Sequence, residues 1–420
     1  MEPISRRRFL GLAAAAGSLA ACKSTSTTAT ATTTTAAPSS PATSVAPTSA
    51  AGAGQRRLVV IEMGGGNDGM STLVPYGVRR YRDLRSRTAI EAGKLIRLDS
   101  SFGLPETLRG LNSAGLALLM GVGTPNPDGS HFAMMERWWR GDPTGTVNPS
   151  TGFLGRLADA IGDPSARATA VTIGSGSSPA LISRTASTMS LPRADVGRLL
   201  AAARPDDKML SAFQAALRDL GVGADATMLG QARHGTADAL RFAQTLADLD
   251  EEKDRGYPGS PLGNGLKLAA RLLEADNGVR IVHVPMGNDF DTHDDHAGRH
   301  AQLMNEFNDA TVAFLKDLKQ RKLDSSVLVM TTSEFGRTAK DNGSSGLDHG
   351  AASVAMLAGP VVKGVHGEYS SLDKLDDNDN LVATVGFERY YATVAEKWFG
   401  VPASEVLAGS AKPLDGLIKA

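Results

Sequence analysis

The sequence predicts an α/β sandwich built around a mostly parallel sheet, in a folded domain that begins near Arg56. Short apolar, β-branched runs recur along residues 56–420, and stretches with helical apolar spacing lie between them. Continuous apolar runs of this kind are typical of strands that are buried on both faces. Strands that alternate with helices pack as layers around one core, which is why we expect a sandwich.

Each expected element comes from a local pattern in the sequence. Six apolar runs predict strands at 58–61, 116–122, 168–173, 281–284, 327–331 and 353–357. Apolar stripes predict helices over 209–220 and 303–318, and a last helix is expected over 387–399, ended by Gly400 and Pro402. The mostly helical stretch from about 191 to 276 is expected to be an insertion or cap within the 56–420 domain, because no linker separates it.

The first 22 residues carry export signals. SRRRFL at 5–10 is a twin-arginine motif, and the apolar run behind it is too short for a membrane span. The run ends in Leu-Ala-Ala-Cys, which resembles a bacterial lipobox with Cys22 as the lipidated residue; a simple signal peptide with a chance cysteine is the alternative. We therefore expect the twin-arginine translocase as a partner and a membrane-anchored lipoprotein that faces the periplasm or the cell exterior.

Composition limits the other partners. Residues 23–55 consist almost only of Ser, Thr, Ala, Pro and Gly, so they are expected to form a disordered tether. Cys22 is the one cysteine, so no disulfide can form within the chain. The formal net charge is -1 and no basic block follows the N-terminus, which argues against nucleic acid as a partner.

Acidic and imidazole side chains follow several of the predicted strands. In an open parallel sheet, ligands bind beyond the carboxyl ends of the strands. The residues at these positions are Asp68, Ser130, His131, Asp289, Asp291, His293, His296, Glu334, Arg337, Asp348 and His349. Carboxylates and imidazoles are ligands for Zn, Mn or a similar divalent ion. We expect one or two such ions, with Asp68, Asp291, His293, Glu334 and His349 as candidate ligands.

Each residue also has a simpler interpretation. Asp68 could be a turn aspartate, and Glu334 could cap the turn that follows it. His296 and His300 lie one helical turn apart and are more typical of surface or packing positions. Gly64, Gly66 and Gly69 fit G-x-G-x-x-G, but Pro75 would interrupt the helix that a dinucleotide site requires.

Several motifs in order resemble the exported bacterial family known as domain of unknown function 1501. They are LVVIEMGGGNDGMSTLVPY, GVGTPNPDGSHFAMMERWWRG, GFLGRLAD, FDTHDDH, TTSEFGRTAKDNGSSGLDHG and FERYYATVAEKWFGV. The family is regarded as a branch of the alkaline phosphatase and sulfatase superfamily. This resemblance implies a three-layer α/β/α sandwich, alkaline-phosphatase-like, with metal ligands at strand ends.

The resemblance also implies roles for single residues. Asp68 matches the superfamily's first metal ligand, and His349 matches its last. Ser130 is the expected nucleophile, with Thr72 as the alternative. Asp291 and His293 are two positions apart where the superfamily has four, and Glu334 and Phe335 stand where it has Asp and His. The ion could therefore be single, held by Asp291, His293 and His349, or one of a rearranged pair with Asp68 and Glu334, or lost.

We expect an exported, metal-dependent hydrolase of phosphate or sulfate esters that acts on a small-molecule or glycan ester. Ser130, or a water activated by the metal, would attack the ester, and Arg337 and His131 would stabilise charge on its oxygens. Two other classes stay open. One is a noncatalytic envelope protein that binds a glycan or a partner in the same cleft; the other is an exported NAD(P) oxidoreductase.

Overall fold

The computed structural model describes residues 56–163, 166–174, 176–191, 255–275, 278–287 and 289–419. The expected signal peptide with Cys22, the tether and the predicted helix at 209–220 lie outside these residues. Within the described residues, no helix has both the length and the apolar character that a membrane crossing requires.

A nine-stranded sheet runs through the centre of the described domain, in the order β10-β4-β9-β8-β1-β7-β5-β6, with β11 beside β4. Its strands are β1 (Arg57–Glu62), β4 (Leu116–Gly123), β5 (Ala170–Ile173), β6 (Thr188–Leu191), β7 (Ile281–Pro285), β8 (Val327–Thr332), β9 (Ser353–Ala358), β10 (Gly364–His366) and β11 (Val385–Gly386). A separate hairpin joins β2 (Leu95–Arg97) to β3 (Gly103–Pro105). The six strands predicted from apolar runs are confirmed.

The sheet is mostly parallel. β1 lies between β7 and β8 and is parallel to both, and β5 extends the parallel set to β6. β9 is antiparallel to both of its neighbours, β4 and β8. β4, β8, β1 and β7 therefore end at the same edge of the sheet, which is where the polar loops lie.

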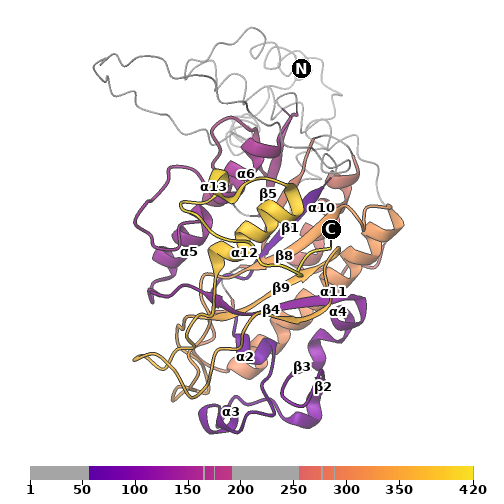
Figure 1. The fold of residues 1–420 in the computed structure, drawn as a ribbon. Helices are drawn as coiled ribbons and strands as arrows, with labels where there is room; N and C mark the ends of the chain where they lie inside the picture. Colours follow the sequence, from indigo (N-terminus) through magenta and orange to yellow (C-terminus); the bar gives the residue numbers. More distant parts are fainter. Residues whose placement is uncertain are drawn as a thin grey trace, which may run out of the picture.

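Helices cover both faces of the sheet (Figure 1). The longer helices are α5 (His131–Arg140), α6 (Phe153–Ile161), α10 (Pro261–Glu274), α11 (His296–Gln320) and α12 (Phe387–Thr393), which continues into the π-helical turn η5 (Val394–Phe399). Shorter ones are α2 (Gly69–Thr72), α3 (Arg79–Leu84), α4 (Arg109–Ala114) and α13 (Ala403–Val406), with single turns η2 (Ala92–Lys94), η3 (Glu106–Leu108) and η4 (Pro179–Leu181).

Strand β1 shows how the two faces are filled. Val59 and Ile61 belong to the core under α4, α10 and α11, whereas Leu58 and Val60 belong to the core under α5, α6 and α12. This alternation follows from the two-residue period of a strand. The molecule is therefore a three-layer α/β/α sandwich with a mostly parallel central sheet, as the sequence predicts.

The expected insertion at about 191–276 needs a correction at its C-terminal end. Most of it lies outside the described residues, but α10 is part of the main domain. Ser260 caps this helix by accepting from the Gly263 amide, and Pro261 occupies its first turn. Leu262 and Leu266 are fully buried in the core over the sheet. A helix that fills the main core is not part of a cap.

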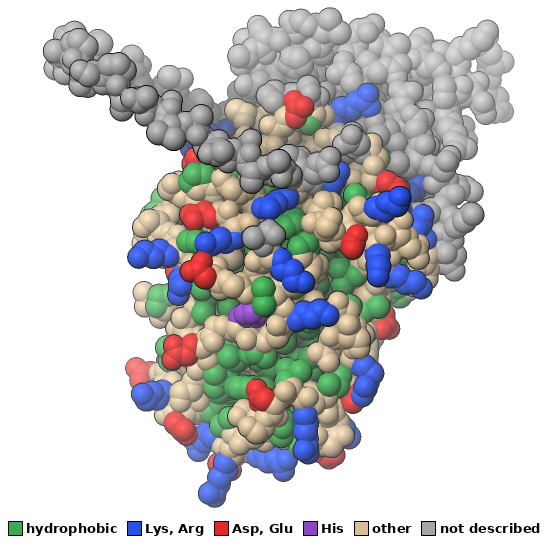
Figure 2. Space-filling model, turned by 45° about the vertical axis from the view of Figure 1, so that its right-hand side comes forward, with side chains coloured by type: hydrophobic (Ala, Val, Ile, Leu, Met, Phe, Trp, Pro, Cys, Tyr) green, Lys and Arg blue, Asp and Glu red, His purple; other side chains and the backbone are tan. Residues whose placement is uncertain are grey.

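Acidic and basic side chains are interspersed on the face drawn in Figure 2, and apolar side chains are visible in its lower half. No large area of a single charge covers this face. The distribution agrees with the near-neutral composition of the chain.

Candidate metal centre

Polar loops from four parts of the chain meet at the carboxyl edge of the sheet. They follow β1, β7 and β8, and the fourth is the start of α5, which comes after β4. Because these strands are parallel to one another, residues more than 200 positions apart in the sequence become neighbours. This edge brings together His131, Asp291, His293, Glu334 and His349.

His131 is the first residue of α5. Its Nδ1 lies 2.9 Å from Glu334 Oε1, which also accepts the amide of Gly65 at 2.7 Å. Because a carboxylate only accepts, the proton of a neutral His131 ring lies on Nδ1. The hydrogen bond to Glu334 also raises the pKa of His131 above its ordinary value. The Nε2 atom is left facing Asp291 Oδ2 at 3.5 Å.

His293 has the same arrangement on the loop after β7. Its Nδ1 lies 2.9 Å from Asp348 Oδ1, which Asn342 also contacts at 3.2 Å. Hydrogen bonding to His293 lowers the pKa of Asp348. The Nε2 atom of His293 points the other way and lies 3.1 Å from Asp291 Oδ1.

His349 completes the set from the loop before β9. Its Nδ1 lies 2.7 Å from the Gly129 carbonyl oxygen, which can only accept. Its Nε2 lies 3.1 Å from Asp291 Oδ1 and 3.0 Å from Nε2 of His293. In their neutral forms, both rings therefore direct a lone pair into the same small volume.

These contacts describe a cation site. Lone pairs 3.0 Å apart repel each other unless a proton or a cation lies between them, and the Asp291 carboxylate adds negative charge at the same point. Ligand atoms of His131, Asp291 and His349 all lie within 4.8 Å of one another. Imidazoles held by a carboxylate or carbonyl on the far nitrogen, together with one carboxylate, are the usual surroundings of Zn²⁺ in proteins. The residues therefore fit a divalent metal ion.

The guanidinium of Arg337 holds the Asp291 carboxylate in place. Burial by itself would raise the pKa of Asp291, but hydrogen bonding and charge from Arg337 lower it below its ordinary value. Arg337 is fully buried and donates to Asp291 Oδ1 at 2.6 Å and to four backbone carbonyls, those of Gly65, Gly66, Phe290 and Leu347. Arg337 is expected from the sequence to bind ester oxygens, but its guanidinium is buried and holds Asp291, one of the candidate ligands. His131, expected to stabilise charge on the ester, lies with the candidate ligands Asp291 and His349.

Asp68 lies apart from this cluster. Both of its carboxylate oxygens accept from Arg85, each at 2.9 Å, and the amide of Ser71 donates to one of them at 3.0 Å. Arg85 and His296 hold the pKa of Asp68 well below its usual range, against the opposing effect of burial. The Arg85 guanidinium already neutralises the Asp68 carboxylate, so this carboxylate does not need a metal ion as its counter-charge.

The remaining predicted residues have other contacts. Ser130 caps α5, with its Oγ accepting from the Ala133 amide at 3.4 Å, and it is exposed. Thr72 is fully buried and donates to the Asp68 carbonyl at 2.8 Å, so it does not reach solvent. Glu334 contacts His131 and lies behind the ligands.

Phe335 closes one side of the cluster. Its ring stacks on His349 with centroids 4.8 Å apart and lies 4.9 Å from His131. Gly66 faces the same ring at φ +91°, where a Cβ atom would come within 2.6 Å of it. The glycine loop after β1 is thus shaped by the aromatic ring. Its Gly65 and Asn67 amides donate to Glu334 and Ser333, and α2 behind it has four residues, so the loop does not form a dinucleotide cradle.

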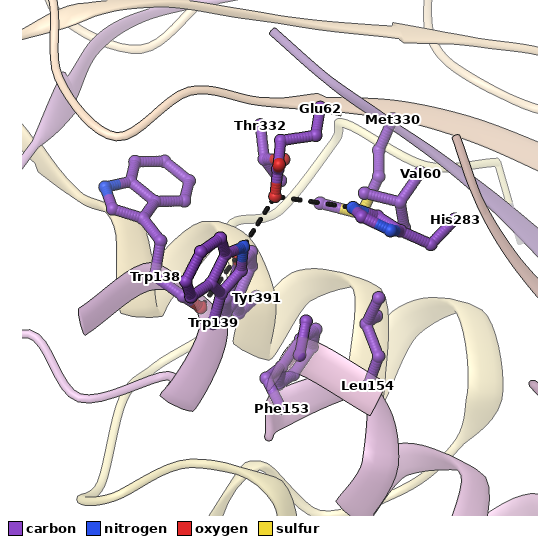
Figure 3. A pocket seen from close by; sticks show the side chains of 11 residues that line it. Val60, Glu62, Trp138, Trp139, Phe153, Leu154, His283, Met330, Thr332 and Tyr391 are labelled. Carbon is purple, nitrogen blue, oxygen red and sulfur yellow. Dashed lines mark hydrogen bonds and ion pairs between the residues drawn. The ribbon is translucent and has the colours of Figure 1, made fainter. Parts of the chain in front are cut away.

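A second buried polar cluster lies beneath α5, and the sequence patterns did not reveal it. Glu62 Oε2, at the end of β1, accepts from Trp139 Nε1 at 2.6 Å and lies 3.3 Å from His283 Nε2 (Figure 3). Leu154 and Phe153 line the opposite side of the small cavity below them. Burial would raise the pKa of Glu62, but hydrogen bonding and charge from His283 lower it. This cluster ties α5 to the sheet.

The family model described as "Protein of unknown function (DUF1501)" matches residues 105–386. The chain belongs to the DUF1501 family. The family expected from the motifs is therefore confirmed, and within the described residues the match covers His131, Asp291, His293 and His349. A search of curated proteins found no match for this DUF1501 chain.

Solved structures similar to the DUF1501 chain include three enzymes. The lipoteichoic acid synthase LtaP from Listeria monocytogenes shares 10% identity, with 85% of this chain and 75% of that chain covered and a TM-score of 0.38. The alkaline phosphatase from the Antarctic bacterium TAB5 shares 13%, with 73% and 92% covered and a TM-score of 0.31. The PsFucS1 sulfatase from Pseudoalteromonas sp. shares 11%, with 86% and 71% covered and a TM-score of 0.37.

Proposed function

We propose that this chain is a metal-dependent hydrolase of phosphate or sulfate esters that holds one divalent ion on His131, Asp291, His293 and His349. One observation carries the proposal: the imidazole rings direct nitrogen lone pairs to the same place as the Asp291 carboxylate, and the Nε2 atoms of His293 and His349 are 3.0 Å apart. A divalent ion bound there would supply Lewis-acid polarisation of an ester oxygen.

One ion agrees better with the residues than two. A second ion would need Asp68 and a residue at position 335, by the superfamily pattern that the motifs imply. Asp68 is paired with Arg85 through both oxygens, and Phe335 has no ligand atom. We therefore expect a stoichiometry of one ion per chain.

The residues around the ion have separate tasks. Glu334 and Asp348 keep protons on Nδ1 of His131 and His293, which leaves Nε2 of each ring free for the ion. Arg337 fixes Asp291. Ser130 is exposed and lies one residue before His131, so we assign its hydroxyl to the attack on the ester. Its Oγ would bond to phosphorus or sulfur as the ester's alcohol leaves with the hydroxyl proton, and water would then hydrolyse the Ser130 ester.

The charge of the cluster favours one class of ester. Asp291, Glu334 and Asp348 contribute three negative charges, and Arg337, which contacts Asp291, contributes one positive charge. With a divalent ion the sum is close to zero. A site without net positive charge does little to offset the second negative charge of a phosphate monoester, so a singly charged phosphodiester or sulfate ester is favoured. We expect kcat/KM to favour bis(4-nitrophenyl) phosphate or 4-nitrophenyl sulfate over 4-nitrophenyl phosphate by about tenfold.

Export and anchoring complete the proposal. The twin-arginine motif and Cys22 support export in the folded state, followed by lipid attachment to the membrane. The substrate would then be a small-molecule or glycan ester outside the cytoplasm. If a Cys22→Ala variant remained in the membrane fraction, the lipid anchor would be excluded.

Elemental analysis of the protein purified after export tests the metal directly. We expect near-stoichiometric Zn, Mn or Fe in the wild type and loss of that metal in His349→Ala. His366→Ala is the matched control, because His366 lies on β10 and its ring contacts the Val362 carbonyl. Metal retained in His349→Ala would overturn the ligand assignment.

A noncatalytic envelope protein is the second candidate. The stacking of Phe335 on His349 and the use of Asp68 by Arg85 favour it, since both alter positions where the superfamily pattern has ligands. This candidate predicts no hydrolysis of the three esters. A purified chain without metal, whose melting temperature does not respond to added Zn²⁺ or Mn²⁺, would support it.

A further inference from the structure

We propose that a buried hydrogen-bond chain, Arg85–Asp68–His296–Thr292, positions the loop that carries two of the metal ligands. The inference rests on the proposed function, because its subject is the binding of that ion. It gives Asp68, His296 and Thr292 a common task.

Thr292 lies between the ligands Asp291 and His293 and is fully buried. Its Oγ1 is 2.7 Å from Nδ1 of His296, at the start of α11. His296 Nε2 is 3.3 Å from Asp68 Oδ2, a carboxylate oxygen that only accepts, so the ring proton lies on Nε2. Nδ1 then accepts, and the Thr292 hydroxyl is the donor.

The Arg85 end of this hydrogen-bond chain is fixed. Arg85 binds both oxygens of Asp68 and also donates to the carbonyls of Ala339 and Thr338, at 2.8 and 3.0 Å. Ser71 Oγ contacts Nε2 of His296 at 3.0 Å. These contacts restrict the His296 ring, and the ring in turn fixes the Thr292 hydroxyl that donates to it.

The backbone of Thr292 links the two ligand loops. Its carbonyl accepts from the Leu347 amide at 2.9 Å, and Leu347 directly precedes Asp348 and His349. The His296 amide donates to the Ser345 carbonyl at 3.0 Å. Movement of Thr292 would therefore displace Asp291, His293 and His349 together.

Ser71 and His296 have the contact of a nucleophile and its base, but they are not a second catalytic site. Both side chains are buried, at 3% and 1% exposure. Because the Ser71 hydroxyl and the His296 ring are both enclosed, the hydrogen-bond chain acts through Asp291 and His293, and its members are positioning residues. Outer partners of metal ligands change metal affinity by about 10–100-fold when they are removed.

The test compares two chemically identical substitutions. Thr292→Val removes the hydroxyl that donates to His296, whose exposure is 1%. Thr172→Val removes a matching hydroxyl 3.0 Å from Nδ1 of His283, with both residues at 2% exposure. His283 belongs to the Glu62 cluster drawn in Figure 3, which includes none of the proposed ligands. Zn²⁺ dissociation constants are measured by competition with a chelating dye, and apo-protein melting temperatures are measured alongside.

We expect Thr292→Val to weaken Zn²⁺ binding about 10–100-fold and Thr292→Ser to restore it to within about threefold of wild type. Thr172→Val should lower the apo melting temperature similarly and leave Zn²⁺ affinity unchanged. Equal affinity for Thr292→Val and wild type, or equal loss in both valine variants, would overturn the inference while the metal site stands. A wild type that binds no divalent ion would overturn both proposals. Should Thr292→Val not fold, Ser71→Ala tests the same chain through the other nitrogen of His296.

Discussion

Histidines close together in the sequence have different roles here because their surroundings differ. His293 is half exposed, and its ring faces Asp291 and His349. His300, seven residues later, is buried and its Nε2 donates to Asn67 Oδ1 at 3.0 Å. Burial and the neighbouring His296 lower the pKa of His300 to about 3. The His293 ring presents Nε2 toward the proposed cation, whereas the His300 ring stays neutral inside the fold.

His300 makes stability depend on pH. Its folded pKa lies below the unfolded value of about 6.5, so the stabilisation is complete above pH 6.5 and is lost as pH falls toward 3. Between pH 6.5 and 5 we expect this group to remove about 2 kcal/mol from the free energy of unfolding. Urea titrations of wild type and His300→Gln measure it. The glutamine keeps a donor for Asn67 but does not titrate, so an equally steep pH dependence in His300→Gln would contradict the assignment.

Single residues also mark the limit of prediction from sequence. Asp291, His293 and His349 follow strands of one parallel set, so their meeting at the sheet edge could be predicted. Asp68 also follows such a strand, but Arg85, which comes directly after α3, neutralises its carboxylate. Nothing in the spacing of the two residues shows that pairing. Arg337 was assigned to the substrate because its burial could not be read from the motif.

At the scale of elements, α5 connects the metal centre to the core. His131 opens the helix, and Trp139 lies eight residues later, about 12 Å along the axis. Trp139 donates to Glu62, whereas Nε1 of the neighbouring Trp138 is buried and has no hydrogen-bond partner among the residues that the structure describes. The two adjacent indoles thus differ in whether the ring N–H donates a hydrogen bond to the sheet.

Trp139→Phe should destabilise the protein by about 1.5–3 kcal/mol beyond the loss shared with Trp138→Phe, because it removes a hydrogen bond to a charged acceptor. Trp138→Phe removes an unpartnered donor and serves as the control for lost ring area. Urea unfolding of both variants gives the comparison. Equal losses would mean that the Glu62 contact contributes nothing measurable.

The elements also differ in how well the sequence predicts them. Long apolar runs predicted six strands correctly, since burial on both faces leaves a strong pattern. The direction of β9 could not be predicted, because an antiparallel strand in the middle of a buried sheet has the same apolar pattern as a parallel one. The short edge strands β6, β10 and β11 have few residues, and their runs did not stand out.

At the scale of the whole molecule, the proposed ion would link the segments that follow β4, β7 and β8. Binding to the folded state alone raises stability by an amount set by ligand concentration and affinity. We expect Zn²⁺ at about 100 times its dissociation constant to add about 2.7 kcal/mol, seen as a higher melting temperature that EDTA reverses. The His349→Ala variant should not respond. An equal rise in that variant would place the ion elsewhere.

The sandwich has one geometric consequence for practical work. β1 starts at the amino edge of the sheet, and the imidazole cluster lies past its opposite end, after six residues or roughly 20 Å of extended chain. A bead, a fluorophore or a fusion partner joined ahead of Arg57 would therefore attach on the far side from the cluster. Immobilising the protein through that end should leave the edge with the imidazole cluster open to large, insoluble material.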